Sequence, residues 1–250
     1  MRLALAQTAS EPGDIVANVA RHAGAVEDAH TAGASVVVFP ELSLTGYELP
    51  LIASDATLRL SPDDERLRPL QEACARTNVT AVAGAPVVAG GRLLLAALLL
   101  RPDGAISIYG KRNLFGDEGK IFDLGAGPVT FDCRDGTRLA LGVCADIGDD
   151  EQAREACAGG ADAWILPLLT SPTGYPGDVA RALRAATRTG MTVAFANHAA
   201  PTGGWPTAGG SGAWYGDGTS IVAKTGEQLM TVVISPIGSD RPISPAPGPS

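Results

Sequence analysis

The sequence is poor in basic clusters, in cysteine and in long apolar runs, and each shortage excludes a class of protein. Its 250 residues carry 19 lysines and arginines against 27 aspartates and glutamates, a net charge of −8. Phosphate binding needs a basic stripe or face, so we expect no nucleic-acid partner and no binding to acidic membranes. The longest aliphatic run, Leu93 to Leu100, is far shorter than the roughly 18 residues needed to cross a bilayer, and predicts a buried strand instead.

Cysteine and metal-ligand patterns are equally sparse. The chain has four cysteines and neither a C-x-x-C pair nor an H-E-x-x-H sequence, so we expect no disulfide scaffold and no bound metal. The first residues, M-R-L-A-L-A-Q-T, become polar before they could form the apolar segment of a secretory signal. We therefore predict a cytoplasmic protein with four reduced thiols, those of Cys74, Cys133, Cys144 and Cys157.

Apolar stretches alternate with amphipathic ones, which predicts a mixed α/β domain. Apolar residues make up 45% of the chain, enough for a sizeable core. Strands are expected at residues 3–6, 35–39, 80–85, 92–100, 105–109, 139–143, 163–166, 192–196, 218–223 and 228–234. Helices are expected from Asp14, as N-cap, to about Gly33, and at residues 62–78, 151–158 and 177–189. We expect one domain over residues 1–234 and a Pro/Ser/Gly-rich C-terminal tail over residues 235–250.

Three reactive side chains stand just past apolar runs: Glu41, Lys111 and Cys144. The ends of strands and their loops form ligand crevices in α/β sheets, so these groups can converge although they are far apart in sequence. Taken singly, each residue is better explained without a function: Glu41 as a loop acid, Lys111 as a surface cation and Cys144 as a small buried thiol. A Cys144–His198 pair is an alternative. The other histidines, His22 and His30, fall in the first predicted helix, where we expect a solvated face.

In these three segments the sequence resembles the nitrilase superfamily of carbon–nitrogen hydrolases, whose catalytic set is a Glu, a Lys and a Cys. Glu41 matches the first motif through F-P-E-L-S-L-T-G-Y, Lys111 the second through Y-G-K-R-N-L-F-G-D-E, and Cys144 the third through G-V-C-A-D. Further similarity at residues 181–197 and 209–218 extends the resemblance over almost the whole chain. It implies a four-layer α-β-β-α sandwich, and a homodimer as in many relatives.

The resemblance also implies roles for the matched residues. Glu41 would act as general base, Cys144 as nucleophile, and Lys111, with the backbone N–H of Ala145, would stabilise the oxyanion. Glu118 resembles a second glutamate found in many members, which would orient Lys111 or the substrate amide; its simpler interpretation is a loop acid. The chemistry would need no cofactor.

Some positions depart from the family pattern, and these concern the substrate more than the chemistry. Asn113 replaces the usual His, Ala145 the common aromatic, and Gly148-Asp149-Asp150 the frequent Arg-Phe-Pro. Asp146 is retained, and we interpret it as a hydrogen-bond acceptor in the turn after Cys144. Substrate contacts are expected from Tyr47, Ala145, Leu169 and Thr170, and from Trp205 or Trp214.

The function expected from the resemblance is thiol-dependent hydrolysis of a small carboxamide, with release of ammonia from a thioester intermediate. Alternatives are a nitrilase, an N-carbamoyl amino acid hydrolase, and a non-catalytic binding or assembly member of the same fold. The expected partner is therefore a small molecule with an amide or related C–N bond. The sequence determines neither the acyl group nor the leaving amine.

Overall fold

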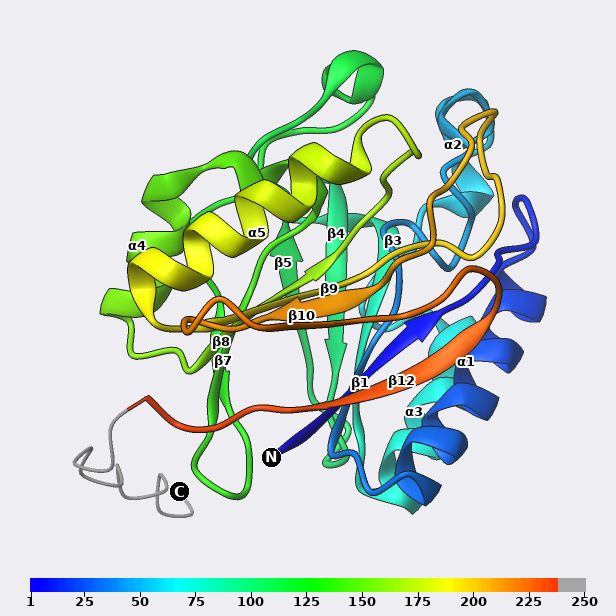
Figure 1. Cartoon of the computed structure of the whole chain (residues 1–250). Helices are drawn as coiled ribbons and strands as arrows, with labels where there is room; N and C mark the ends of the chain where they lie inside the picture. The colour runs from blue at the N-terminus through cyan, green and yellow to red at the C-terminus, as the bar shows by residue number, and fades with distance from the viewer. Residues whose placement is uncertain (238–250) are drawn as a thin grey trace.

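A computed structural model describes residues 1–237 as two six-stranded sheets packed face to face, with helices on their outer faces (Figure 1). The first sheet has the order β12-β1-β2-β3-β4-β5, with strands at Gln228–Val233, Arg2–Gln7, Val36–Val38, Thr80–Ala89, Arg92–Leu100 and Ile106–Gly110. The second has the order β11-β10-β9-β8-β7-β6, with strands at Ser220–Val222, Gly212–Trp214, Thr192–Ala196, Ala163–Pro167, Arg138–Leu141 and Thr130–Asp132.

Two helices cover each sheet. Helices α1 (Ile15–Thr31) and α3 (Arg68–Thr77) lie on the first sheet, and α4 (Asp150–Ala158) and α5 (Tyr175–Thr189) on the second (Figure 1). Short helical turns occupy the loops: α2 (Leu49–Ser54), η1 (Ala56–Leu58), η2 (Glu65–Leu67), η3 (Gly116–Lys120) and η4 (Cys144–Gly148). The layers confirm the predicted α-β-β-α sandwich.

The centre of each sheet is parallel, which brings its loops to one edge. Strands β1, β2 and β3 run parallel, with Leu3 opposite Val36 and Val36 opposite Thr80. Strands β7, β8 and β9 are likewise parallel, and the two sheets meet where β8 contacts β2 and β3. Within each sheet the carboxyl ends of the parallel strands share an edge. The two edges meet where the backbone N–H of Glu41, after β2, donates to the carbonyl oxygen of Leu168, after β8, at 3.5 Å.

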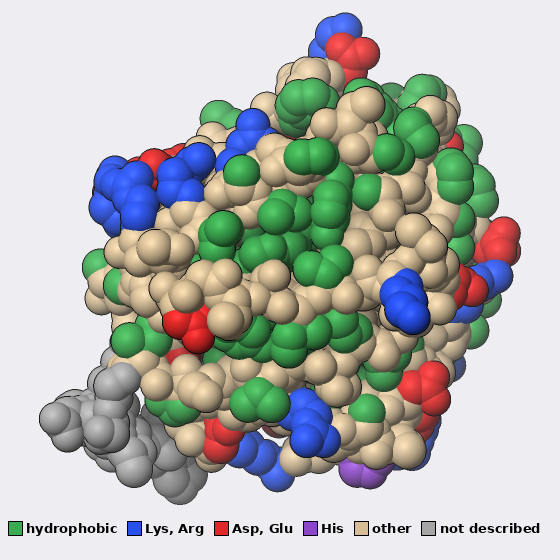
Figure 2. All heavy atoms as spheres, viewed as in Figure 1, with side chains coloured by type: hydrophobic (Ala, Val, Ile, Leu, Met, Phe, Trp, Pro, Cys, Tyr) green, Lys and Arg blue, Asp and Glu red, His purple; other side chains and the backbone are tan. Residues whose placement is uncertain are grey.

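Each sheet has one edge strand, β12 or β11, on the same side of the sandwich. Strands β11 and β12 are joined by residues 223–227, and Ile221, Val222 and Val233 on them are exposed. Figure 2 shows apolar side chains gathered across the middle of the face on which β10 and β12 lie in front, with basic side chains near α4 and α5. No helix within residues 1–237 is both long and apolar enough to span a bilayer.

Most elements lie within a few residues of their predicted positions, and the differences have local causes. Asp14 caps α1 as predicted, its carboxylate accepting from the backbone N–H of Ala17. The helix predicted at residues 62–78 begins at Arg68, because Asp64 caps a separate 3-10 turn, η2, before it. Helix α2 and strands β6 and β10 were not predicted; each is six residues or shorter. Of the predicted tail, residues 238–250 lie outside the described residues, and Ile237 donates to Asp162.

His22 corrects a prediction. It lies on the buried face of α1, where its ring stacks on Phe39 with centroids 3.8 Å apart. Its Nδ1 is 2.7 Å from the carbonyl oxygen of Asn18 and its Nε2 2.8 Å from Ser43 Oγ, so both ring nitrogens have partners without water. Burial lowers its pKa to about 3, which keeps the ring neutral. His30, by contrast, is exposed as predicted.

Candidate active site

The candidate site is built around the buried ammonium group of Lys111. Lys111 follows β5, and its Nζ lies 2.6 Å from Glu41 Oε1 and 2.8 Å from Glu118 Oε1. The side chains of Glu41, Lys111 and Glu118 are all excluded from solvent. Cys144, at the start of η4, lines the same cavity as Glu41 and Glu118. The structure therefore brings together the four residues that the sequence predicts.

Close backbone packing places Glu41. It follows β2 in a segment that crosses Gly84 of β3, where a Cβ atom would lie 2.3 Å from the backbone nitrogen of Leu42. A side chain at position 84 would therefore displace the segment. Leu42 itself has a positive φ of 51°, a strained conformation for leucine. From the other side, His198 Nε2 lies 2.7 Å from the carbonyl oxygen of Glu41.

Cys144 also has a strained backbone. Its φ is 44°, a left-handed conformation that a side chain with a Cβ seldom adopts. The sharp turn from β7 into η4 presents the thiol to the cavity, where Sγ lies 3.5 Å from the carbonyl oxygen of Leu169. Strain of this kind is stored where surrounding contacts enforce the geometry. Here those contacts come from Asp146.

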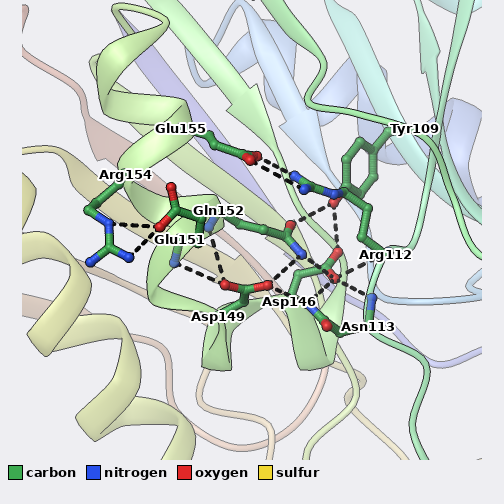
Figure 3. A network of polar contacts seen from close by, with 9 residues as sticks. All are labelled: Tyr109, Arg112, Asn113, Asp146, Asp149, Glu151, Gln152, Arg154 and Glu155. Atoms are coloured by element: carbon green, nitrogen blue, oxygen red, sulfur yellow. Dashed lines mark hydrogen bonds and ion pairs between the residues drawn. The ribbon is translucent and has the colours of Figure 1, made fainter.

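Asp146 joins the segment after Lys111 to the turn that carries Cys144, because it accepts from the backbone N–H groups of Asn113 and Val143. Figure 3 shows Asp146 among Tyr109, Asn113 and Gln152. Its side chain is fully buried. Its two carboxylate oxygens accept hydrogen bonds at 2.8–3.3 Å from the Tyr109 hydroxyl, the backbone N–H groups of Arg112, Asn113 and Val143, and the side-chain amides of Asn113 and Gln152. The interpretation of Asp146 as the acceptor of the turn thus holds, and the structure adds its link to the lysine segment.

Two of the departures from the family pattern contact each other. Asn113 Nδ2 donates to Asp149 Oδ2 at 3.1 Å (Figure 3). This bond lies beside the Asp146 hub, by which we mean Asp146 and the groups that donate to its carboxylate. The same carboxylate group of Asp149 caps α4 through its other oxygen, which accepts from the backbone N–H groups of Glu151 and Gln152. Asn113 and Asp149 therefore act as one unit that extends the hub to the start of α4.

Burial and mutual charge set the protonation of the cluster. Burial raises the pKa of Glu41 to about 7, although the Lys111 ammonium opposes the shift. Burial, together with the charge of Glu41, raises the pKa of the Cys144 thiol well above its usual range. For Lys111 burial disfavours the ammonium, but the charges of Glu41, Cys144 and Glu118 outweigh it and raise the pKa. At neutral pH the cluster therefore holds an ammonium, a protonated thiol and a carboxyl group near its midpoint.

The alternative Cys144–His198 pair is not supported by the geometry. His198 is buried, and its Nε2 is engaged by the carbonyl oxygen of Glu41. Burial lowers its pKa to about 4. The histidine lies behind the glutamate and supports its backbone, a position that its sequence context did not indicate.

A cavity of about 380 Å³ opens above Cys144. Its lining includes all four predicted contacts: Tyr47, Ala145, Leu169 and Thr170. The Tyr47 hydroxyl donates to Glu118 Oε1 at 2.6 Å, so this oxygen accepts from both Tyr47 and Lys111. Trp205 lies at the rim against Phe115, with ring centroids 6.5 Å apart, whereas Trp214 is buried against Phe195 away from the cavity.

The cavity lining also contains two charged residues that the sequence did not indicate, Asp178 and Arg181 of α5. Their spacing of three residues is common on helix surfaces, so nothing in the sequence distinguished them from a solvated pair. Asn197, a position of family likeness, holds Thr170 in the wall: its Oδ1 accepts from the Thr170 backbone N–H at 3.0 Å. Within residues 1–237, no group of three or more His, Cys, Asp or Glu side chains is arranged to hold a metal ion.

Comparisons with known proteins agree with this geometry. The family model described as "Carbon-nitrogen hydrolase" matches residues 2–236. Among curated proteins, "Hydrolase in pqqF 5'region" from Pseudomonas protegens is 29% identical over 191 residues, which cover 74% of this chain and 65% of that protein. "Glutamine-dependent NAD(+) synthetase" from Xylella fastidiosa is 28% identical over 241 residues, 89% of this chain and 40% of that protein. The chain thus spans less than two thirds of these relatives.

Solved structures of an amidase from Nesterenkonia sp. AN1, from the nitrilase superfamily, are similar over nearly the whole chain. A variant showing the result of Michael addition of acrylamide at its active-site cysteine has a TM-score of 0.82 and 27% identity, covering 94% of this chain and 93% of that one. Another variant, in complex with butyramide, has a TM-score of 0.81 and 28% identity, covering 93% and 90%. Fold and sequence motifs therefore lead to the same group of proteins.

Proposed function

The chain belongs to the carbon–nitrogen hydrolase family, and from this premise we propose that it hydrolyses a small carboxamide through a thioester on Cys144. One observation carries the proposal: the buried Lys111 ammonium bonds both Glu41 and Glu118 beside the Cys144 thiol. Burying this many ionisable groups is costly, and such clusters are concentrated where chemistry requires perturbed pKa values. The amidase neighbours support an amide substrate over a nitrile or a carbamoyl compound.

In the first half of the reaction, Cys144 Sγ attacks the amide carbon while its proton passes to Glu41. Glu41 Oε2 is buried and has no hydrogen-bond partner among the described residues, so it is free to accept that proton. The raised pKa of the thiol means that attack and proton transfer proceed together, without a standing thiolate. The C–S bond forms, and the amide oxygen becomes an oxyanion.

Lys111 and the backbone N–H of Ala145 stabilise the oxyanion. Within the described chain the ammonium donates to two carboxylates, which leaves one of its three N–H groups for the substrate oxygen. Donors fixed in place before the reaction need no reorganisation as charge develops. Glu41 then returns its proton to the amide nitrogen, the C–N bond breaks, and ammonia leaves a thioester on Cys144.

In the second half, Glu41 takes a proton from water, whose oxygen attacks the thioester carbon. The C–S bond breaks, the thiol regains a proton, and the carboxylic acid leaves. One amide and one water thus give one acid and one ammonia. The Glu118 carboxylate accepts hydrogen bonds from the Tyr47 hydroxyl, the Lys111 ammonium and the backbone N–H of Phe115. It therefore holds Lys111 in place between the carboxylates of Glu41 and Glu118.

The test is ammonia release from a panel of amides, nitriles and carbamoyl compounds, with the native protein and with Cys144→Ala. Cys157→Ala is the matched control, because Cys157 is a half-buried thiol of α4 outside the cavity lining. We expect release by the native protein and the control, and none by Cys144→Ala. Equal release by Cys144→Ala would exclude Cys144 as the nucleophile, and a preference for nitriles or carbamoyl compounds would exclude the amidase assignment.

A further inference from the structure

The cavity above Cys144 has a charged rim on the side of α5. Of its described lining residues, four are acidic or basic: Glu41 and Glu118 at the base, and Asp178 and Arg181 of α5. Arg181 Nη1 donates to Asp178 Oδ1 at 2.8 Å. The Arg181 side chain is 46% exposed and that of Asp178 17% exposed, so solvent and ligand both reach the pair. The same cavity is therefore lined by the Cys144 thiol and by the Asp178–Arg181 ion pair, whose net charge is zero.

Small residues line the cavity between Cys144 and the Asp178–Arg181 pair. Ala145, beside the nucleophile, has a methyl group, and Gly148 has no side chain at all. Arg181 lies across Gly148, its Nε 3.7 Å and its Cδ 3.8 Å from where a Cβ of residue 148 would be. Both small residues line the cavity together with Cys144 and Arg181. Ala145 and Gly148 therefore add little side-chain volume to the cavity wall that also contains Cys144 and Arg181.

The ion pair can open at little cost. Its partners are three residues apart on one helix and partly solvated, and such pairs contribute little to stability because water screens them. Arg184 and Arg188 of the same helix bond Asp150 instead, and none of these three lines the cavity. Asp178 and Arg181 are therefore the pair of α5 that a ligand in the cavity can reach.

The charge of the pair selects among amide ligands. An uncharged amide gains nothing from it. An anionic ligand gains Arg181 but is repelled by Asp178, and a cationic ligand gains Asp178 but is repelled by Arg181. A ligand with one carboxylate and one ammonium replaces each half of the pair with a charge-assisted hydrogen bond. Such a ligand must also carry a carboxamide that reaches Cys144.

We propose that the substrate is the side-chain carboxamide of a free α-amino acid, with its α-carboxylate on Arg181 and its α-ammonium on Asp178. This assignment rests on the proposed amide hydrolysis at Cys144 and names its substrate class. Asp178 and Arg181 are then specificity residues that bind the end of the substrate opposite the scissile bond. Because the amide, carboxylate and ammonium groups are each held, the site also distinguishes the L from the D enantiomer.

The test compares four amides that differ by one charged group at a time. L-glutamine carries both charges, glutaric acid monoamide lacks the ammonium, 4-aminobutanamide lacks the carboxylate, and butyramide lacks both. We expect kcat/KM to be highest for L-glutamine and lower for D-glutamine. Arg181→Met should lower kcat/KM about tenfold or more for the two carboxylate-bearing amides, with butyramide unchanged. Asp178→Asn should do the same for the two ammonium-bearing amides. Arg184→Met, the matched control, should leave all four unchanged.

The outcomes separate this inference from the proposed function. If butyramide is hydrolysed as well as L-glutamine and Arg181→Met changes nothing, the substrate class is wrong while hydrolysis at Cys144 stands. The same holds if none of the four is hydrolysed but another amide is, in a Cys144-dependent reaction. If no amide is hydrolysed, the proposed function itself fails.

Discussion

Replacing Asp146 tests whether the buried hub positions the two catalytic segments. Asp146→Ala leaves one fully buried donor, the Val143 backbone N–H, without its acceptor, whereas the Tyr109 hydroxyl keeps Gln152 Oε1 at 3.0 Å. An unsatisfied buried donor costs about 2 kcal/mol, so the free energy of unfolding should fall by about 2 kcal/mol. Urea denaturation measures this free energy. Asp146→Asn keeps one oxygen and should cost about half as much, about 1 kcal/mol.

The same substitutions should slow the reaction more than they weaken substrate binding. The hub fixes the distance between Lys111 and Cys144, and a misplacement of about 1 Å costs about 100-fold in rate. We therefore expect kcat of Asp146→Asn to fall about 100-fold, with a smaller change in KM. Asp28→Asn, at an exposed position of α1, is the matched control. Unchanged stability and unchanged kcat in Asp146→Ala would refute the reasoning.

Three further predictions concern single groups. If ionised Glu41 is the base, kcat/KM should rise with pH through about 7, and a flat profile between pH 6 and 8 would contradict it. Tyr47→Phe removes the 2.6 Å bond to Glu118 and should lower kcat/KM about tenfold; an unchanged value would show that this bond does not hold the cluster. His22 and His198 are buried with pKa values lowered to about 3 and about 4, so the unfolded chain binds more protons between about pH 6.5 and 4. The free energy of unfolding should therefore decrease as the pH is lowered from about 6.5 to 4, by up to about 3 kcal/mol from His198. Urea denaturation at several pH values measures this decrease, and His198→Gln should make it smaller.

The sequence carried enough information for the fold class and the base of the candidate site. Strands such as residues 92–100 are long and apolar, so their burial dominates every competing local preference. The order of the three motifs indicated the family. In the structure Glu41 and Cys144 line one cavity, and Lys111 bonds Glu41. Their roles, and the homodimer and cytoplasmic location expected from the sequence, remain predictions.

Features that depend on tertiary contact could not be predicted. Helix periodicity placed His22 on α1 but could not show that Phe39 and Ser43 would bury it. His198 has no local signal, because its partner is a carbonyl group 157 residues away. Asp178 and Arg181 have the spacing of any helix surface pair, and the cavity beside them is formed by loops from other parts of the chain.

The most direct test of the central claim is the mass of the protein during turnover. An acid quench followed by peptide mapping would locate the acyl group of an amide substrate. The thioester mechanism predicts that the acyl mass appears on the peptide that contains Cys144, and that adduct and ammonia release both disappear in Cys144→Ala. Ammonia release that persists in Cys144→Ala, with no acyl mass on that peptide in the native protein, would contradict it.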